Sequence, residues 1–316
     1  MAILFITSTH IGDAILSTGV LDQLLKKYPD DPVTIACGAP AAKVFAAVPG
    51  LARIHTLHKR SYSAHWFDLW RSTVTENWKV LVDLRRTMLP YVLRAQKKYS
   101  LSKMRKPLHR VELISSMLST TPLNPKVWIN DRHEEQANTL VGDQNNFLAI
   151  APGANWQGKI WPAQNFVELA HRLIDSGGLL ESSRLLLVGA ENERKKAQTI
   201  VNSFPSSRII DGMGIDVLTT YAALNRCKLF VGNDSAMMHL AAASGKPTVG
   251  LFGPTHDIFY APWGKNGLVV RTPESVEELI GNNSYNTHTT GTMMANLTTE
   301  TVEKAIKKRW GNTLTQ

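Results

Sequence analysis

The sequence predicts an α/β protein built from two successive doubly wound domains, each with a parallel sheet and helices on both faces. The chain has 316 residues, and a single hydrophobic core is usually smaller than that. Short apolar runs alternate with helical segments along most of the chain. A polar stretch over Asn124–Asn146 interrupts this pattern, which restarts at Phe147–Ala151. We therefore predict domains over residues 1–146 and 147–316.

The expected strands are apolar runs bounded by Pro, Gly or polar residues. They cover Ala2–Thr7, Val33–Cys37, Arg53–Leu57, Val80–Asp83, Phe147–Ala151, Arg184–Val188, Arg208–Ile210, Leu229–Val231 and Thr248–Phe252. Between them, helices are expected over Ile15–Tyr28, Ala41–Val48, Asp131–Thr139, Pro162–Ser176, Glu193–Phe204, Asp216–Asn225 and Ala236–Ser244. An amphipathic helix, Thr298–Trp310, closes the chain, and the sequence leaves open that it packs back on the first domain.

Composition narrows the function classes. No apolar stretch approaches the ~20 residues of a membrane span, and the start lacks a signal-peptide pattern, so a cytoplasmic protein is expected. Cys37 and Cys227 lack metal-ligand spacing and are expected to be core residues. The net charge of +9 predicts an acidic partner. Within Arg85–Arg110 nine residues are Lys or Arg and none is acidic.

The loop after the first strand carries a candidate catalytic carboxylate. In doubly wound sheets, ligands bind beyond the carboxyl ends of the strands. Gly12 permits a tight turn and Asp13 stands at the start of the next helix. Asp13 is a helix cap in one interpretation and a general base for an acceptor hydroxyl in the other. The loop matches neither a dinucleotide fingerprint nor a P-loop.

A second loop, Ala151–Pro162, follows the strand that opens the second domain. It contains Gly153 and Gly158, which allow close backbone approach, and Lys159 beside a helix start. A lysine at such a position suits a diphosphate. A lone loop lysine is otherwise a solvated charge, but Gly, Lys, Trp and Pro together favour a binding loop.

The third loop, Val231–Ala243, holds another strand-to-helix transition. The amides of Ser235 and Ala236 are expected as free donors at a helix N-terminus, which binds anions. His239 lies one turn further on the same face. A single histidine at such a position is more often a hydrogen-bonded core residue than a ligand-binding one, so His239 has both interpretations. Asp234 is explained equally well as a helix cap. Glu191 and Glu193 follow another strand, where a carboxylate can bind ribose hydroxyls. In the alternative interpretation they are acidic residues of a first helical turn, which the helix dipole stabilises.

These loops together resemble the ADP-heptose:lipopolysaccharide heptosyltransferases, glycosyltransferase family nine. The matching segments stand in family order over nearly the whole chain: Gly12-Asp13 with Ser17-Thr18, Gly158-Lys159-Ile160-Trp161-Pro162, Gly232-Asn233-Asp234-Ser235-Ala236 with His239, and Gly250-Leu251-Phe252-Gly253-Pro254-Thr255. The resemblance implies a GT-B fold, in which two Rossmann-like domains face a central cleft. It also implies an inverting transfer from ADP-heptose without a cofactor or a catalytic metal.

The resemblance also implies roles for individual residues. Asp13 resembles the catalytic base, and Lys159 the lysine that contacts the donor and assists catalysis. The implied donor-binding residues are Asn155, Lys159, Glu191 or Glu193, Met213 near the adenine, Asp234, Ser235, Ala236 and His239. The family's acceptors are anionic lipid-linked glycans at the inner face of the membrane, held by the N-terminal domain. Arg85, Arg86 and Arg94 are therefore expected to bind the acceptor.

A peripheral contact with the inner membrane surface is also expected, through Lys97, Lys98, Lys103, Arg105 and Lys106. The chain departs from the family at Ser17-Thr18-Gly19, at Ala154-Asn155 and in the cysteine-free stretch Gly281–Asn296. These departures leave open a different nucleotide-sugar donor or a non-lipopolysaccharide acceptor. A nucleotide-binding module without catalysis is disfavoured by Asp13. A nucleic-acid binder is disfavoured because no such scaffold is recognisable.

Overall fold

The computed structural model describes residues 1–102, 106–142, 145–281 and 291–314. It divides into two compact units, Met1–Asn130 and Asp131–Gln316. The sequence placed the boundary between residues 146 and 147. The difference lies in helix α6 (Asp131–Val141), which packs against α9 (Val217–Leu224) of the second unit. Arg226 fixes it there through an ion pair with Glu134 at 2.8 Å.

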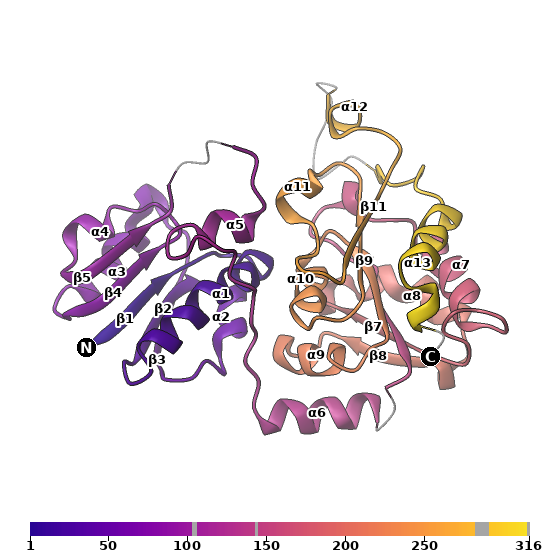
Figure 1. Cartoon of the computed structure of the whole chain (residues 1–316), viewed down its shortest axis with the longest axis horizontal. Helices are drawn as coiled ribbons and strands as arrows, with labels where there is room; N and C mark the ends of the chain where they lie inside the picture. Colours follow the sequence, from indigo (N-terminus) through magenta and orange to yellow (C-terminus); the bar gives the residue numbers. More distant parts are fainter. Residues whose placement is uncertain (103–105, 143–144, 282–290, 315–316) are drawn as a thin grey trace. The chain divides into compact units, whose positions relative to one another are not determined.

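The first unit is a five-stranded sheet in the order β3-β2-β1-β4-β5 (Figure 1), and every neighbouring pair is parallel. Its strands are β1 (Ala2–Ile6), β2 (Val33–Gly38), β3 (Leu51–Leu57), β4 (Trp78–Asp83) and β5 (Ala95–Ser100). Its helices are α1 (Ile11–Lys27), α2 (Ala39–Ala42), α3 (Ala64–Thr73), α4 (Leu89–Val92) and α5 (Arg110–Ser115).

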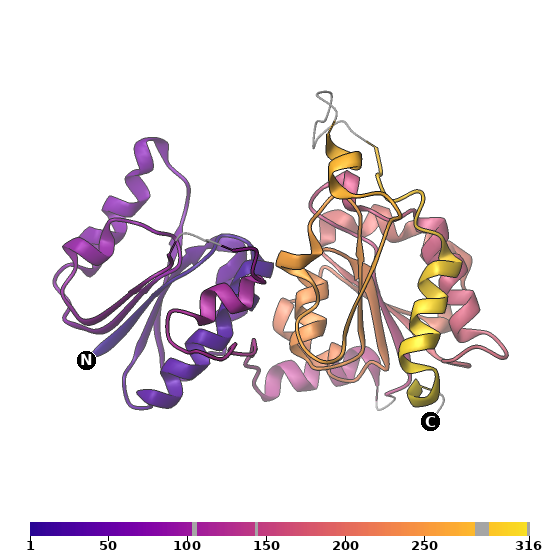
Figure 2. The ribbon, with the colours of Figure 1, turned by 45° about the horizontal axis from the view of Figure 1, so that its top comes forward.

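Successive side chains of β1 point to opposite faces of this sheet. Leu4 and Ile6 belong to one buried cluster with Leu69 of α3 and Leu89 of α4. Phe5 points to the other face, where its ring lies 6.4 Å from that of Phe45. Helices α3 and α4 therefore cover one face and α1 the other (Figures 1 and 2).

The second unit is a six-stranded parallel sheet in the order β11-β10-β9-β6-β7-β8. Its strands are β6 (Phe147–Ala151), β7 (Arg184–Gly189), β8 (Ile209–Met213), β9 (Leu229–Asn233), β10 (Thr248–Phe252) and β11 (Gly267–Arg271). Besides α6 and α9, its helices are α7 (Ala163–Ile174), α8 (Arg194–Ser203), α10 (Ala236–Ala243), α11 (Asp257–Tyr260), α12 (Val276–Ile280) and α13 (Thr299–Leu314).

The sequence left the position of the last helix open. In the structure α13 packs against α7 and β11 of its own unit (Figure 1). Val302, Ile306 and Trp310 enter the core of that unit. Arg172 of α7 reinforces the contact through an ion pair with Glu303 at 2.9 Å.

The predicted doubly wound α/β class is confirmed in both units. One predicted helix, Ala41–Val48, is wrong: the chain forms the short helix α2 and a 3-10 turn over Lys43–Phe45. Helix α2 begins two residues earlier than predicted but stops at Ala42, and Pro49 disfavours a helical backbone at Val48. Strands β5 and β11 and helix α3 were not predicted. In the described part of the chain, no helix is long and apolar enough to cross a membrane.

Both cysteines lie in the cores, as expected. Cys37 and Cys227 are buried free thiols, and burial raises the pKa of each to about 12. Neither therefore supplies a thiolate near neutral pH.

Candidate functional site

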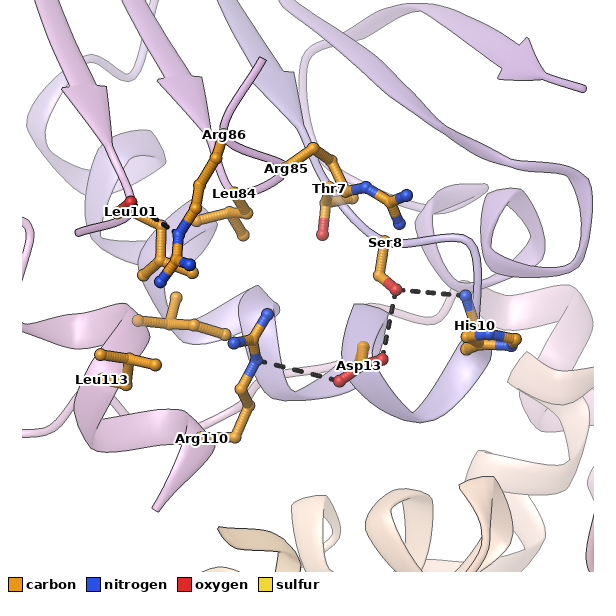
Figure 3. A pocket seen from close by; sticks show the side chains of 11 residues that line it. Thr7, Ser8, His10, Asp13, Leu84, Arg85, Arg86, Leu101, Arg110 and Leu113 are labelled. Atoms are coloured by element: carbon orange, nitrogen blue, oxygen red, sulfur yellow. Dashed lines mark hydrogen bonds and ion pairs between the residues drawn. The ribbon is translucent and has the colours of Figure 1, made fainter. Parts of the chain in front are cut away.

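A pocket of about 690 Å³ opens in the first unit beyond the carboxyl ends of β1, β4 and β5 (Figure 3). Its wall combines polar and apolar side chains. The lining residues are Thr7, Ser8, His10, Asp13, Leu84, Arg85, Arg86, Leu101, Arg110, Leu113 and Ile114. This edge of the sheet is the one at which the sequence predicted a site.

Asp13 lies in the first turn of α1, where the helix dipole favours a negative charge. It is not the helix cap, because that position belongs to His10, which makes no capping hydrogen bond through its side chain. One carboxylate oxygen, Oδ2, accepts a hydrogen bond from the Ser8 hydroxyl at 3.3 Å. The other, Oδ1, is buried without a hydrogen bond and faces Arg110 Nε at 3.9 Å (Figure 3). Ser8 and Arg110 thus hold the carboxylate in place, and its side chain stays 24% exposed in the wall of the pocket.

Buried Asp83 shapes the turn that carries two of the pocket arginines. Its carboxylate accepts hydrogen bonds from the Arg85 amide at 2.7 Å and from the amide and hydroxyl of Thr87 at 2.6 and 2.8 Å. Such Asx turns are typical where a strand ends. Arg86 takes a left-handed conformation with φ 57°, and its guanidinium donates to the carbonyls of Leu101 and Ser102.

The structure separates Arg94 from the other predicted acceptor-binding residues. Arg94 precedes β5, and its carbonyl accepts from the Trp78 amide at 3.1 Å, where β4 begins. It therefore lies at the amino-end edge of the sheet, opposite the pocket. The third arginine of the pocket is Arg110, at the start of α5. The sequence placed Arg110 in the basic stretch but gave it no role.

In the second unit, Lys159 is fixed by Asp234. Lys159 ends a 3-10 turn over Gln157–Lys159, and its Nζ lies 2.6 Å from Asp234 Oδ2. The same oxygen accepts from the Thr255 hydroxyl at 2.9 Å. The two charged side chains are 17% and 7% exposed. Desolvation strengthens a charge-assisted hydrogen bond, so this lysine is an ordered cation rather than a loose surface charge.

Fully buried Asn233 connects the loop that follows β6 with the loop that follows β9. Its Oδ1 accepts from the Trp161 amide at 3.0 Å, and its Nδ2 donates to the Pro152 carbonyl at 2.9 Å. Since β6 and β9 are neighbours, this side chain bridges the loops that follow both strands. The sequence did not assign it a role, although an amide before Asp-Ser at a strand end is a signal for such a bridge.

Helix α10 begins directly behind Asp234. Ser235 is its N-cap, and the Ser235 hydroxyl is buried without a hydrogen bond. The first amides of a helix have no partner within it, so they remain donors for an anion. His239 is buried one turn further, with its ring centroid 6.2 Å from that of Tyr260. The predicted donor residues Lys159, Asp234, Ser235, Ala236 and His239 thus stand on two adjoining loops and one helix.

The structure distinguishes the two candidate ribose carboxylates. Glu191 is 67% exposed and pairs with Arg194, which also binds Asp211. The hydrogen-bonded Arg194 guanidinium lowers the pKa of Glu191, whose charge is therefore neutralised locally. Glu193 is 17% exposed and accepts from the Ala190 amide at 3.1 Å.

Two glycines make room for Glu193 and for Met213 at the carboxyl ends of β6 and β7. A Cβ at Gly153 would lie 2.4 Å from the Glu193 carboxyl carbon, and one at Gly189 would lie 2.9 Å from Met213 Cε. Met213 is buried, whereas Asn155 is exposed on the loop before Lys159. A carboxylate and a thioether side by side suit the polar and the flat parts of a nucleoside.

The curated proteins similar to this chain include lipopolysaccharide heptosyltransferases. The chain is 31% identical over 145 residues to lipopolysaccharide heptosyltransferase 1 of Escherichia coli, an alignment that covers 46% of this chain and 43% of the relative. The chain thus spans less than half the length of that relative. It is 24% identical to an E. coli lipopolysaccharide heptosyltransferase 3 over 81% of this chain and 84% of that protein.

Two solved structures share the fold at low identity. A family 9 glycosyl transferase from Veillonella parvula superposes with a TM-score of 0.76 at 20% identity and covers 97% of this chain and 96% of its own. An E. coli heptosyltransferase with ADP superposes with a TM-score of 0.72 at 18% identity and covers 98% and 100%. Both show that this chain, with one parallel sheet in each of its two units, has the GT-B fold.

A family model matches residues 92–286, more than half of the chain, and describes glycosyltransferase family 9 (heptosyltransferase). That match includes Arg110, Lys159, Glu193, Met213 and the Asp234–His239 loop. The chain therefore belongs to glycosyltransferase family 9, and its two parallel sheets agree with that family's fold in the solved structures.

Proposed function

We propose that this protein transfers a heptose, or a related sugar, from an ADP-sugar to an anionic lipid-linked glycan of the lipopolysaccharide core. The observation that carries the proposal is the Asp13 carboxylate in the wall of a pocket that Arg85, Arg86 and Arg110 also line. The relatives support the substrate class, since they are lipopolysaccharide heptosyltransferases and one solved structure holds ADP.

The proposed chemistry is an inverting displacement with Asp13 as general base. The acceptor hydroxyl attacks the anomeric carbon and passes its proton to Asp13 as the new bond forms. The bond from the anomeric carbon to the diphosphate oxygen breaks, and ADP leaves. Ser8, 3.3 Å from Oδ2, and Arg110, 3.9 Å from Oδ1, would orient the carboxylate toward the acceptor hydroxyl.

On the donor side, negative charge grows on the departing diphosphate, and stabilising that charge supplies much of the rate. Lys159 and the amides of Ser235 and Ala236 would hold the diphosphate, with His239 behind them. Asp234 positions Lys159 through the 2.6 Å ion pair. These groups already supply positive charge, so we propose that neither a cofactor nor a metal ion takes part.

Glu193 rather than Glu191 would bind the ribose hydroxyls, because Arg194 donates to both oxygens of Glu191 at 2.7 and 2.8 Å, whereas Lys196 stays 4.0 Å from Glu193. Met213 would pack on the adenine and Asn155 would approach the donor from the loop before Lys159. This proposal implies selectivity for the nucleotide. ADP-heptose should raise the melting temperature of the protein more than UDP- or GDP-sugars at equal concentration, measured by thermal shift. Equal or greater stabilisation by UDP- or GDP-sugars would contradict an ADP-sugar donor.

A module that only binds nucleotides is the rival, and turnover separates it from the proposal. We expect ADP release from ADP-heptose to rise when acceptor is added. Binding of ADP-heptose without release of ADP would exclude transfer.

For the acceptor, we propose that Arg85, Arg86 and Arg110 meet its phosphate and carboxylate groups. Arg110→Ala should raise the KM for the acceptor by roughly ten- to a hundredfold, the worth of one charge-assisted hydrogen bond of about 1.5–3 kcal/mol. Arg94→Ala is the matched control and should leave KM unchanged, because Arg94 lies at the other edge of the sheet. Steady-state kinetics with varied acceptor measure both variants. If Arg94→Ala raised the KM for the acceptor more than Arg110→Ala does, Arg94 rather than Arg110 would bind the acceptor.

We further propose that the protein works in the cytoplasm at the inner face of the membrane, where a lipid-linked acceptor is accessible. The basic stretch alone is not a single lipid-facing surface. Lys97 and Lys98 are neighbours on β5, so they point to opposite faces of the sheet. Lys97 also lies 3.3 Å from the Tyr28 hydroxyl. Lys106 is exposed, while Lys103 and Arg105 lie outside the described residues.

A further inference from the structure

The first unit exposes apolar side chains that its core does not use. Among the described residues, nine large apolar side chains are exposed, and five of them lie in the two connections on either side of β4. We name these five the α3–α4 apolar surface: Tyr62, Phe67, Met88, Tyr91 and Val92. Tyr62 and Tyr91 are 103% and 78% exposed. Exposed apolar groups gathered this way mark an interaction surface.

Both connections cover the same face of the sheet. Leu69 of α3 and Leu89 of α4 are anchored in one buried cluster, so the outer sides of the two helices face away from that cluster together (Figures 1 and 2). Tyr62 and Met88 lie soon after β3 and β4 end, on the side of the sheet that holds the arginine-lined pocket, whereas Tyr91 and Val92 lie further along, shortly before β5. Met88 follows the pocket residue Arg86 by only two positions.

The backbone before α3 turns Tyr62 outward. Tyr62 and Ser63 both have positive φ, 52° and 58°, a left-handed conformation that residues with a side chain adopt rarely. The ring of Tyr62 is fully exposed, so no contact with the core offsets the free-energy cost of this conformation. The turn therefore presents an aromatic side chain at the edge of the sheet.

Aromatic and cationic side chains surround this turn. Trp66 and Trp70 of α3 are partly exposed, and the ring of Trp70 lies 5.4 Å from that of Phe67. Lys59, Arg60 and Arg71 flank them and are exposed. The acid of this segment, Asp68, is paired with Arg60 at 2.7 Å. Tyrosine, tryptophan and basic residues on one amphipathic segment are typical of the interface of a bilayer with anionic headgroups.

We propose that the α3–α4 apolar surface inserts into the headgroup region of an anionic bilayer, with Lys59 and Arg71 on the lipid phosphates. This inference rests on the proposed function, because a lipid-linked acceptor requires the enzyme to reach a membrane. The apolar side chains supply the insertion and the cations supply the preference for anionic lipid. The pocket at the same edge of the sheet then receives the acceptor's glycan as it leaves the bilayer.

The test compares the full-length chain with Phe67→Ser/Tyr91→Ser in flotation with vesicles of phosphatidylcholine, alone or mixed with phosphatidylglycerol. The wild type should float with the mixed vesicles and far less with pure phosphatidylcholine. The double variant should lose binding by tenfold or more, because two side chains no longer leave water. Val201→Ser, on the exposed face of α8, is the matched control and should bind as wild type does.

A second readout separates this proposal from the proposed function. ADP binding and transfer to a water-soluble, lipid-free glycan acceptor should be unchanged in the double variant, while the KM for acceptor embedded in vesicles rises. Unchanged vesicle binding in the double variant would overturn the surface. So would conversion of a wild-type dimer to a monomer by the same substitutions, which would assign the surface to a second copy of the chain. Absent transfer with intact vesicle binding would contradict the proposed function alone.

Discussion

Replacing Asp13 with asparagine should lower the rate of sugar transfer by roughly two to four orders of magnitude, the usual contribution of a general base. Asparagine has nearly the same shape and can still accept the Ser8 hydroxyl, so the pocket should keep its form. It cannot take up a proton from the acceptor. The affinity for ADP should be unchanged, because Asp13 lies in the first unit and the donor loops in the second.

The experiment measures kcat at saturating donor and acceptor, together with the Kd for ADP by calorimetry. Asp30→Asn is a suitable control, since Asp30 is exposed in the turn that follows α1. Near wild-type kcat in Asp13→Asn would remove Asp13 from the mechanism. A loss of ADP affinity in the same variant would instead indicate a change of structure.

Lys159→Met should weaken ADP binding by roughly ten- to a hundredfold, the loss of a charge-assisted hydrogen bond worth about 1.5–3 kcal/mol, and should slow transfer as well. It should also destabilise the protein. Asp234 is 7% exposed and would lose its cationic partner, and breaking a buried pair costs about 3–5 kcal/mol. Lys304→Met, on the exposed side of α13, should change neither property.

A double variant separates the two effects of Lys159. Lys159→Met/Asp234→Asn removes the unpaired charge, so the free energy of unfolding in urea should recover while ADP affinity stays low. A chelator should leave wild-type transfer unchanged. Reversible loss of transfer on addition of EDTA would show that a metal ion carries the diphosphate charge. Recovery of ADP affinity in the double variant would show that Lys159 acts only through its ion pair.

The sequence alone determined the α/β class and most of the loops that carry the candidate site. Buried parallel strands such as β1 and β6 are continuous apolar runs, and the glycines and helix starts after them are local signals. Asp13, Lys159 and Asp234 were therefore recognisable without coordinates, because each lies between such a run and the end of the first turn of the next helix. Strand β5 was not, since Ala95–Ser100 is an edge strand with few apolar residues, and its pairing with β4 defines it.

Only the tertiary structure decided which side chains share a site. Arg94 and Arg110 are equal members of one basic stretch in the sequence, but the parallel register of β4 and β5 puts Arg94 at the amino-end edge and α5 brings Arg110 to Asp13. Likewise, Glu191 and Glu193 are two residues apart, and only the structure shows that Arg194 lies 2.7 Å from Glu191 while Lys196 lies 4.0 Å from Glu193. Such choices depend on side chains from distant segments, and local sequence patterns carry no information about their meeting.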